Sequence, residues 1–455
     1  MKNLVILGAG TAGTMMANHL VNKLPKKEWE ITIVDQYKTH YYQPGFLFLP
    51  FDTYTEDQVK KEGKRFIPKG VKYIQKKINQ IFPETNNVEL EDESLNYDIL
   101  IVATGSKIAP DETDGLLGSL WKKDIFDFYT YEGALALRNK LRDWPGGKLV
   151  VHITEMPIKC PVAPLEFAFL ADSYFKKKGM RNKVEITYVT PLDGAFTKPT
   201  CTKALNYLLE EKQIKIETDW SIMEVDNEKK AIVDYVDKEI PFDLLVTVPT
   251  NMGDEVIERS GLGDDLNFIP THKHTLQSKA HDNIFVIGDA TNVPASKAGS
   301  VAHFQAETLT DNIILHAQGY SLKEEFDGHA NCFIETGDNK ALLIDFNYDQ
   351  EPVHGTFPFA KIGPLRLLKE SVFNHWGKLA FRWIYWHMLL KGIPIPFVGR
   401  NMSFKGKIFD IKAKVMKNDK STTKLAVLNL ENKTWNIPFV IEPSAGVDRG
   451  VLAIL

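Results

Sequence analysis

The first forty residues show the pattern of a strand, a turn, a helix and a second strand. Residues 3–10 are an apolar run that ends in glycine, residues 11–24 carry apolar side chains at helical spacing, and residues 29–36 contain a second apolar run. Further apolar runs within 97–106 and 283–297 lead into Gly105 and Gly288. Short apolar runs bounded by turn residues are typical of buried parallel strands. The pattern predicts an α/β unit.

A second unit of the same kind lies between these runs. Residues 146–154, 183–191 and 242–250 are apolar enough to form buried strands, and residues 164–178 have helical spacing. The unit does not repeat the glycines of the first one. The sequence therefore predicts two α/β domains, of which only the first carries a glycine-rich turn.

Residues 364–398 form the clearest amphipathic stretch. Apolar side chains recur there at steps of three, four or seven and are interrupted by basic ones: Leu365, Leu368, Val372, Trp376, Leu379, Trp383 and Leu390, with Arg366, Lys369, Lys378, Arg382 and Lys391. Aromatic rings alternating with cations suit a helix that lies in a membrane interface. A helix that covers the protein's own core is the alternative.

The glycine-rich turn has the spacing of a dinucleotide-binding motif. Gly8, Gly10 and Gly13 follow an apolar run directly, and Asp35 ends the next run about 20 residues later. Glycine allows the tight turn and the close approach of a pyrophosphate, the helix N-terminus supplies N–H donors, and the carboxylate accepts from a ribose hydroxyl. An unliganded glycine turn is the alternative.

Cys160 stands in a position where α/β proteins place reactive groups. It follows the predicted strand 146–154 and precedes the predicted helix 164–178, beside Lys159 and between two prolines. A helix N-terminus and a lysine favour the thiolate, which is the nucleophilic form. Prolines remove N–H donors from the place where a diphosphate would bind. A buried, inert cysteine is the alternative, since free cysteines are often buried.

Composition narrows the choice of partner and compartment. The 455 residues are 44% hydrophobic and 25% charged, as in soluble proteins of two or three domains, and the net charge of -4 argues against nucleic acid. Three cysteines are too few for a disulfide framework or a zinc site, so no metal is expected. We expect no signal peptide and no membrane-spanning segment, and hence a protein that lies on the cytoplasmic face of a membrane.

Two further motifs resemble those of flavoproteins with two dinucleotide-binding domains. They are the Ala-Thr-Gly end of the run 97–106 and the Gly-Asp end of the run that begins at residue 283. The resemblance implies two Rossmann-like domains and non-covalent FAD. The cofactor-binding residues that it implies, together with the glycine motif, are Gly8, Gly10, Gly13, Asp35, Gln43, Pro44, Thr104, Gly105, Gly288, Asp289 and Lys297.

The segment around Cys160 resembles sulfide:quinone oxidoreductase. The letters KCPVAPLE, from Lys159 to Glu166, look like that family's K-C-x-x-A-P motif, and Cys332 falls in a segment similar to the one with its second cysteine. YYQPG at 41–45 and GDATNVPASK at 288–297 are also similar. The match covers most of residues 1 to about 395 and is closest to the subgroup with two redox cysteines.

The resemblance implies a mechanism and further site residues. Cys160 and Cys332 would form a redox pair that sulfide reduces, and Glu166 would take a proton, although a solvated or capping glutamate is equally compatible. Tyr129 and Tyr131 stand where some members have a third cysteine or a covalent flavin link. The residues expected to bind the quinone ring are Phe357, Phe359, Tyr385 and Trp386. A small thiol is a possible sulfur acceptor, and a homo-oligomer is expected.

These expectations divide the chain into four parts. Residues 1–110 with 281–330 form the FAD-binding domain, 111–280 the second Rossmann-like domain, 331–400 the region that contacts quinone and membrane, and 401–455 a β-rich appendage. Two other functions are compatible with the same motifs. They are a type II NADH:quinone oxidoreductase, which would need a second glycine motif, and a non-catalytic flavoprotein that senses thiol oxidation.

Overall fold

The computed structural model describes residues 1–359, 361–403, 407–408, 427–429 and 434–436. The chain divides into two compact units, Met1–Ile408 and Phe409–Leu455. In the second unit the structure describes one antiparallel pair, β26 (Val427–Asn429) with β27 (Thr434–Asn436). Of the predicted β-rich appendage 401–455, residues 401–403 and 407–408 belong to the first unit, and the rest, apart from this pair, lies outside the described residues.

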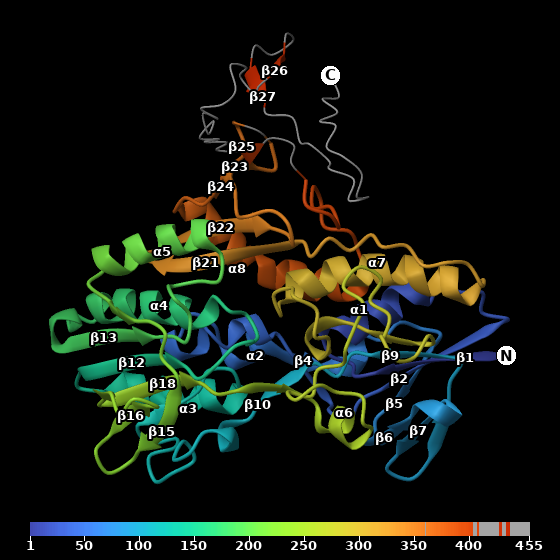
Figure 1. Ribbon diagram of the computed structural model, residues 1–455, viewed down its shortest axis with the longest axis horizontal. Helices are drawn as coiled ribbons and strands as arrows, with labels where there is room; N and C mark the ends of the chain where they lie inside the picture. The colour runs from blue at the N-terminus through green and yellow to red at the C-terminus, as the bar shows by residue number, and fades with distance from the viewer. Residues whose placement is uncertain (360, 404–406, 409–426, 430–433, 437–455) are drawn as a thin grey trace, which may run out of the picture. The chain divides into compact units, whose positions relative to one another are not determined.

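The first sheet of the large unit is fully parallel and carries the glycine motif (Figure 1). Residues alternate across it: Leu4 and Ile6 face the core that includes two long helices, whereas Val5 and Leu7 face a second core on the other side. A parallel sheet covered on both faces accounts for the continuous apolar runs in the sequence. The strand order is β20 (Ile284–Val286), β9 (Ile99–Val102), β1 (Lys2–Leu7), β2 (Trp29–Val34) and β5 (Val71–Ile74). The two helices are α1 (Thr11–Leu20) and α7 (Gly299–Ala317).

The second sheet is also parallel and lies at the other end of the large unit (Figure 1). Its order is β11 (Ile125–Phe126), β18 (Leu244–Val248), β12 (Gly147–Ile153), β13 (Val184–Val189) and β14 (Lys215–Glu217). The associated helices are α3 (Tyr131–Asp143), α4 (Ala163–Lys177) and α5 (Pro199–Glu211). Both α/β units of the sequence analysis are therefore present, and the two-domain fold class is confirmed.

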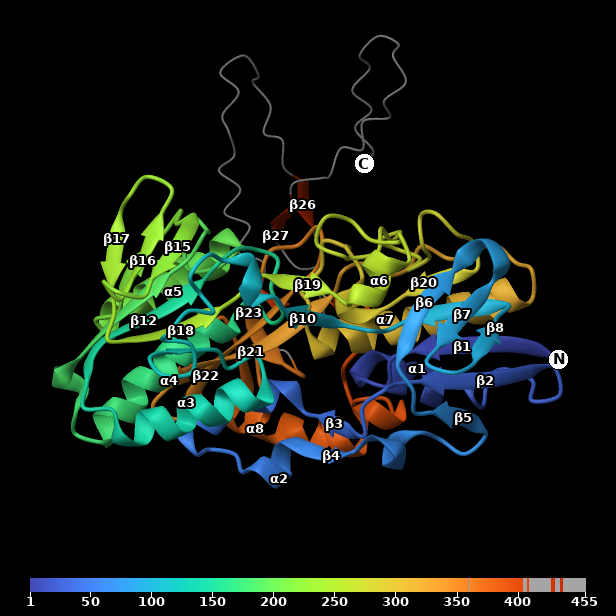
Figure 2. The same cartoon turned by 90° about the horizontal axis from the view of Figure 1, so that it is seen from below.

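Smaller elements flank these sheets (Figure 2). Two short helices among them are α2 (Glu56–Val59) and α6 (Glu255–Arg259). The small sheets are β3 (Thr39–Tyr41) with β4 (Lys60–Glu62), β6 (Ile78–Phe82) with β7 (Asn87–Leu90) and β8 (Ser94–Asn96), β10 (Ser106–Ile108) with β19 (Asn251–Gly253), and β15 (Ile222–Asp226) with β16 (Ala231–Asp234) and β17 (Glu239–Pro241).

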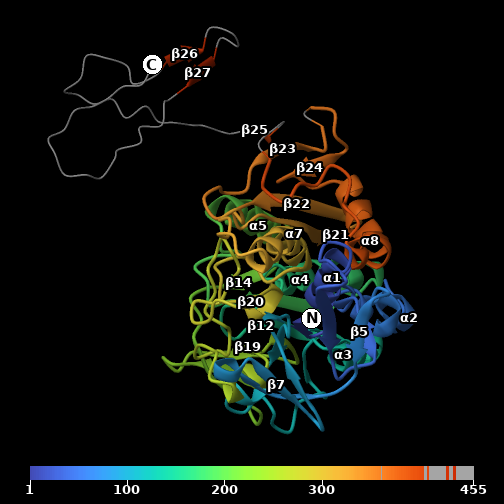
Figure 3. The same ribbon diagram turned by 90° about the vertical axis from the view of Figure 1, so that its right-hand side faces the viewer.

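The third sheet brings the second cysteine to the first. Its outermost strand, β21 (Ala330–Gly337), contains Cys332 and packs on α4, while helix α8 (Val372–His387) packs against β21 and β22 (Figure 3). The order is β21, β22 (Lys340–Phe346), β24 (Leu365–Leu367), β23 (His354–Phe357) and β25 (Lys407–Ile408).

The amphipathic stretch 364–398 is not one helix. Leu365 to Leu367 pair with β23 as a strand, and the helix begins only at Val372. The hydroxyl of Ser371 accepts from the N–H of Asn374 at 3.0 Å, which caps the first turn. Among the described residues, the helices are too short or too polar to cross a bilayer.

Part of the segment 251–280, which the sequence analysis places in the second domain, packs on the first sheet. Val256, Ile257, Leu262 and Ile269 pack in the core beneath the first sheet, together with residues such as Val5. Strand β19 additionally pairs with β10, which follows the first sheet. The chain therefore returns to the first domain near residue 251, because this segment covers the apolar face that Val5 presents.

Candidate functional site

The glycine motif forms a tight and partly open turn. Gly8 has φ +97°, and a Cβ on Gly13 would lie 1.9 Å from the carbonyl oxygen of Gly8, so both positions require glycine. A Cβ on Gly10, in contrast, would meet no atom within 4 Å. Asp35 lies beside the turn, where its Oδ2 accepts from the N–H of Ala9 at 2.6 Å. Burial raises the pKa of this carboxyl.

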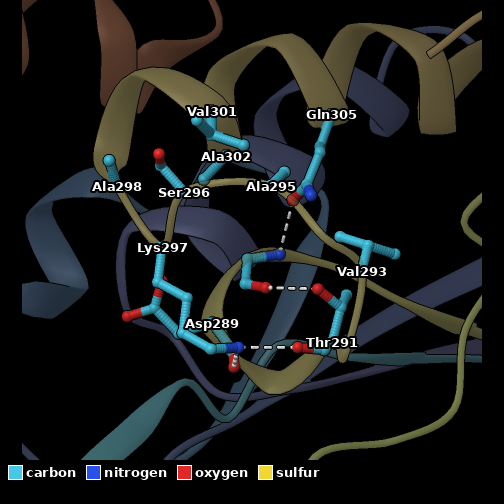
Figure 4. A pocket seen from close by; sticks show the side chains of 11 residues that line it. Asp289, Thr291, Val293, Ala295, Ser296, Lys297, Ala298, Val301, Ala302 and Gln305 are labelled. Carbon is cyan, nitrogen blue, oxygen red and sulfur yellow. Dashed lines mark hydrogen bonds between the residues drawn. The ribbon is translucent and has the colours of Figure 1, made fainter. Parts of the chain in front are cut away.

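Lys297 braces the Gly-Asp segment from below α7 (Figure 4). Its Nζ donates to the carbonyl oxygens of Asp289 at 2.8 Å and Thr291 at 2.7 Å, and lies 3.7 Å from the ring centroid of Phe268. Burial lowers the pKa of Lys297 to about 8. The pocket beside it is lined by Gly288, Asp289, Thr291, Val293, Ala295, Ser296, Lys297, Ala298, Val301, Ala302 and Gln305.

The helix ends, two glycines and one buried hydroxyl of these segments fit a bound dinucleotide. The first turns of α1 and α7 have neither an acidic residue nor a side-chain cap, so their N–H groups are available to an anion. Gly10 and Gly105 border open space. The buried hydroxyl of Thr104 has no hydrogen-bond partner within the described part of the chain. An uncapped helix and an unpartnered buried hydroxyl are what a ligand with phosphates and hydroxyls would complete.

Cys160 and Cys332 come together although they are far apart in the chain. Their half-buried thiols are free rather than joined by a disulfide, and they lie close enough for each to shift the pKa of the other. The contact lowers the pKa of Cys332 and raises that of Cys160, where burial adds to the rise. The contact therefore favours the thiolate, the nucleophilic form, at Cys332 over that at Cys160.

The backbone at Cys160 is strained and held from three sides. Its φ is +45°, in the left-handed region that residues with a side chain seldom adopt. Its N–H donates to the carbonyl of Lys297 at 2.7 Å, and its carbonyl accepts from the N–H of Ala163 at 2.8 Å. The hydroxyl of Tyr129 donates to the carbonyls of Lys159 and Cys160, at 2.7 and 3.2 Å. The loop is thus fixed directly to the segment that carries Lys297.

The lysine whose charge acts on the two thiols is Lys378. The Nζ of Lys159 donates to Gln43 Oε1 at 3.4 Å and to the carbonyl of Ser106 at 3.2 Å, which directs it toward the first domain. Lys378 comes from α8, and its charge favours the thiolate at both Cys160 and Cys332. The lysine next to Cys160 in sequence is therefore not the one that acts on its sulfur.

Glu166 is neither solvated nor a helix cap. It is fully buried, and its Oε1 accepts from the N–H of Glu335 at 2.7 Å and from Lys378. Its Oε2 has no hydrogen-bond partner within the described residues. Burial raises the pKa of the carboxyl, while Lys378 and the N–H oppose the rise. One oxygen of Glu166 remains able to accept a proton beside the thiol pair.

Comparison with known proteins gives the family of this chain and its named relatives. The sequence profile of the pyridine nucleotide-disulphide oxidoreductases matches residues 2–306. The chain belongs to this family. It is an oxidoreductase, and its relatives include the mitochondrial sulfide:quinone oxidoreductases of Dictyostelium discoideum and Mus musculus.

The sequence resemblance to sulfide:quinone oxidoreductase is thereby confirmed. The Dictyostelium protein is 29% identical over 408 residues, 88% of each chain, and the mouse protein is 26% identical over 397 residues, 86% of each. Among solved structures, the sulfide:quinone oxidoreductase of Aquifex aeolicus aligns with a TM-score of 0.71 at 20% identity, over 86% of this chain and 92% of that one. That likeness shows the shared family fold.

The four aromatic residues expected at a quinone site differ in exposure and in their contacts. Tyr385 and Trp386 are buried, and the Tyr385 hydroxyl hydrogen-bonds to Thr11 Oγ1 at 2.7 Å and His40 Nε2 at 2.6 Å. Phe359 is 51% exposed and its ring contacts Phe397 at 5.3 Å. Phe357 is half-buried on β23. Tyr385 therefore contacts the glycine-motif helix, and its pairing with Phe359 around one ring stays a prediction.

Several other predicted residues lie where the motifs indicated. Gln43 and Pro44 are exposed and begin a short 3₁₀ turn that Lys159 contacts. Cys201 is fully buried in α5, and burial raises its pKa to about 12, in keeping with a structural role.

Sequence reasoning assigned no role beside the thiols to Lys378, Glu335, His375 or Tyr129. Lys378 counted as one of several cations on an amphipathic stretch. The spacing of its helix did carry a signal that Lys378 faces inward. Asn374, Lys378 and Tyr385 are separated by four and seven residues and therefore share one face of the helix.

Proposed function

We propose that this protein is an FAD-dependent enzyme that oxidises sulfide through Cys160 and Cys332 and passes the electrons to a membrane quinone. The observation that carries the proposal is the neighbouring thiol pair, since two cysteines distant in the chain meet beside the segment that carries Lys297. The relatives named above support the choice of substrates.

The chemistry begins with the pair joined as a disulfide. Hydrosulfide attacks the sulfur of Cys160, a new S–S bond forms there, and the Cys160–Cys332 bond breaks with its electron pair on Cys332 as a thiolate. Glu166 Oε2 takes the proton of the outer sulfur. A second sulfide or a small thiol then removes that sulfur as polysulfide or persulfide and leaves a thiolate on Cys160.

The two thiolates return to the disulfide by losing two electrons. FAD, when bound, would accept this electron pair and deliver it to quinone. The residues proposed to hold FAD are those of the two glycine-containing turns, with the uncapped ends of α1 and α7 directed at its phosphates and its ring. Tyr129 and Lys297 keep the Cys160 loop in its strained position during the cycle.

The loop before α4 offers little to NADH. Ile158 and Val162 lie in the loop that follows β12 and are almost fully buried. The first turn of α4 carries the acidic Glu166. A carboxylate at a helix N-terminus disfavours a diphosphate there. This favours sulfide over NADH as the source of electrons.

The membrane surface that we propose is the outer face of α8 and its neighbours. Phe373, Trp376 and Trp383 are each more than half exposed on α8, and Phe359 and Phe397 are exposed nearby in sequence. Exposed aromatic rings with basic residues suit a lipid interface. We place this surface on the cytoplasmic side of the membrane and expect quinone to enter there, with Phe357, Phe359, Tyr385 and Trp386 as the first residues to test.

The test is an anaerobic titration of the FAD-loaded protein. Sulfide should bleach the oxidised flavin, NADH should not, and a short-chain quinone should restore the colour. Cys160→Ser should keep FAD but no longer respond to sulfide, whereas the matched control Cys201→Ser should respond as the wild type does.

The other outcomes identify the alternatives. Bleaching by NADH and not by sulfide would indicate a type II NADH:quinone oxidoreductase. Reversible thiol oxidation without flavin reduction by either compound would indicate a thiol sensor. Normal sulfide turnover in Cys160→Ser would overturn the mechanism.

A further inference from the structure

Helix α8 presents different residues to its two sides. Phe373, Trp376 and Trp383 are exposed, whereas Asn374 is fully buried and Lys378 is 12% exposed. Inward-facing residues of α8 reach β21, where Gly377 contacts the ring of Phe333, and the Nδ1 of His375 lies 2.9 Å from the carboxylate oxygens of Glu335. The helix proposed to meet the membrane therefore also completes the surroundings of the strand that carries Cys332.

Lys378 joins the two cysteine-bearing segments. Its ammonium donates to Glu166 on α4 and to the carbonyl of Phe333 at 2.8 Å, and Phe333 is the residue after Cys332. Glu166 in turn accepts from the N–H of Glu335 on the same strand. Because β21 is the edge strand of its sheet, these two side chains satisfy backbone groups that have no strand beyond them.

The charge of Lys378 acts in the same small volume as the thiols. Glu166 and Lys378 form a buried ion pair, and removing one partner of such a pair leaves the other uncompensated. Burial lowers the pKa of Lys378, but the opposite charges around it outweigh that effect and raise the pKa. The titratable and charged groups that face it are Glu166, Cys332, Cys160, Glu335 with its partner His375, and Tyr54 with its neighbour Arg382.

We propose that Lys378 is a positioning residue of the sulfide half-reaction, whose fixed positive charge receives the thiolate that leaves on Cys332. The inference rests on the function proposed above. When hydrosulfide bonds to Cys160, the electron pair of the broken bond stays on Cys332, and Lys378 faces the new negative charge without giving up its proton. The proton of the outer sulfur goes to Glu166 Oε2, which leaves the ammonium as the counter-charge of the thiolate.

A purely structural role for Lys378 predicts a different result. If it served only to satisfy the edge of β21, its loss would lower stability and leave the ionisation of the thiols unchanged. An opposite charge within about 4–6 Å lowers a pKa by about 1–3 units. The ionisation of Cys332 is therefore the property that separates the two roles, and it can be measured without turnover.

The experiment measures the rate of alkylation of Cys332 by iodoacetamide against pH, in protein with Cys160→Ser and Cys201→Ser. Lys378→Met should move the midpoint of the profile up by about one unit, and Lys378→Arg should restore most of the wild-type value. In protein with all three cysteines, Lys378→Met should slow flavin reduction by sulfide about tenfold at pH 7. Lys340→Met, an exposed lysine at the start of β22, is the matched control.

Lys378→Met alone would leave the buried carboxylate of Glu166 unpaired, and a second comparison avoids this. Glu166→Gln alone and Glu166→Gln with Lys378→Met differ only in the lysine, and neither leaves an unpaired charge at Glu166. The pH profile of Cys332 alkylation should have the higher midpoint in the double variant. Equal midpoints in this comparison, or a Lys378→Met protein whose profile matches the wild type, would overturn the inference. Failure of wild-type flavin to respond to sulfide would instead reject the proposed function, because the alkylation profile does not depend on turnover.

Discussion

Tyr385→Phe tests whether this tyrosine supports the glycine motif or binds quinone. The substitution removes one hydroxyl from a side chain that is 2% exposed and keeps the ring. That hydroxyl lies 2.7 Å from Thr11 Oγ1, in the first turn of α1, and 2.6 Å from His40 Nε2. The Nδ1 of His40 lies 3.2 Å from the carbonyl of Ala9, within the glycine motif. The variant therefore breaks a buried link between α8 and the turn that would hold the FAD phosphates.

The magnitude follows from the lost hydrogen bonds to Thr11 and His40, beside which the longer one to the carbonyl of Tyr41 at 3.4 Å counts for little. Burial lowers the pKa of His40 to about 4, so the ring is neutral at pH 7, and its Nε2 accepts the tyrosine proton. A buried acceptor left without a donor costs about 1–3 kcal/mol. We therefore expect a loss of about 2 kcal/mol in the free energy of unfolding, which is roughly 2 °C in melting temperature for a unit as large as Met1–Ile408.

The assay combines thermal unfolding with release of FAD, which is followed by flavin fluorescence. Tyr385→Phe should melt earlier and release FAD at a lower temperature, whereas Tyr207→Phe, at a side chain that is 64% exposed, should match the wild type. An unchanged melting temperature and unchanged FAD release, together with a raised KM for quinone, would refute this reasoning and assign Tyr385 to the quinone.

Three further predictions concern the cofactor turn, Lys297 and α8. Gly13→Ala should give protein that lacks FAD, because its Cβ would lie 1.9 Å from the carbonyl oxygen of Gly8; the ratio of flavin to protein absorbance measures this, and full FAD content would contradict it. The pKa of Lys297 falls from 10.5 to about 8 on folding, so between these values the unfolded chain binds more protons and stability rises with pH. Urea unfolding at pH 7.5 and pH 9.5 should show this rise in the wild type and a smaller one in Lys297→Met, and equal rises would refute the assignment. Trp383→Ser, at a 59% exposed side chain, should weaken binding to anionic vesicles about tenfold and change stability by less than about 0.5 kcal/mol. Unchanged sedimentation with vesicles would exclude Trp383 from the membrane surface, and Tyr207→Ser is the control.

The glycine motif could be predicted because its determinants are local. Gly8, Gly13 and Asp35 lie within one strand, turn, helix and strand unit, and each is required by the geometry of that unit. The strands of both parallel sheets could be predicted equally well from the sequence, since a sheet buried on both faces imposes continuous apolar runs.

The start of α8 and the role of Lys378 depended on contacts that the sequence does not encode locally. Amphipathic spacing continues from Leu365 into the helix, and it is the pairing of Leu365 with Phe357 on β23 that makes the first part a strand. Lys378 is one of many cations in its segment, and only the packing of α8 on β21 directs it to Glu166. The meeting of Cys160 and Cys332 was expected from family resemblance, because spacing along the chain does not predict which distant residues meet.

The abrupt change of surroundings between Phe373 and Asn374 limits how α8 can turn about its own axis. Consecutive residues of an α-helix point about 100° apart, and here one is 54% exposed while the next is fully buried with its amide bonded to the carbonyls of Ala341, Arg366 and Lys369. Rolling the helix by a single residue would force the amide of Asn374 away from all three acceptors. The proposed membrane surface and the proposed thiol site thus lie on opposite sides of one helix whose rotation is locked. We therefore expect a detergent that loosens α8 to slow sulfide oxidation even where it leaves the thiols and the flavin intact.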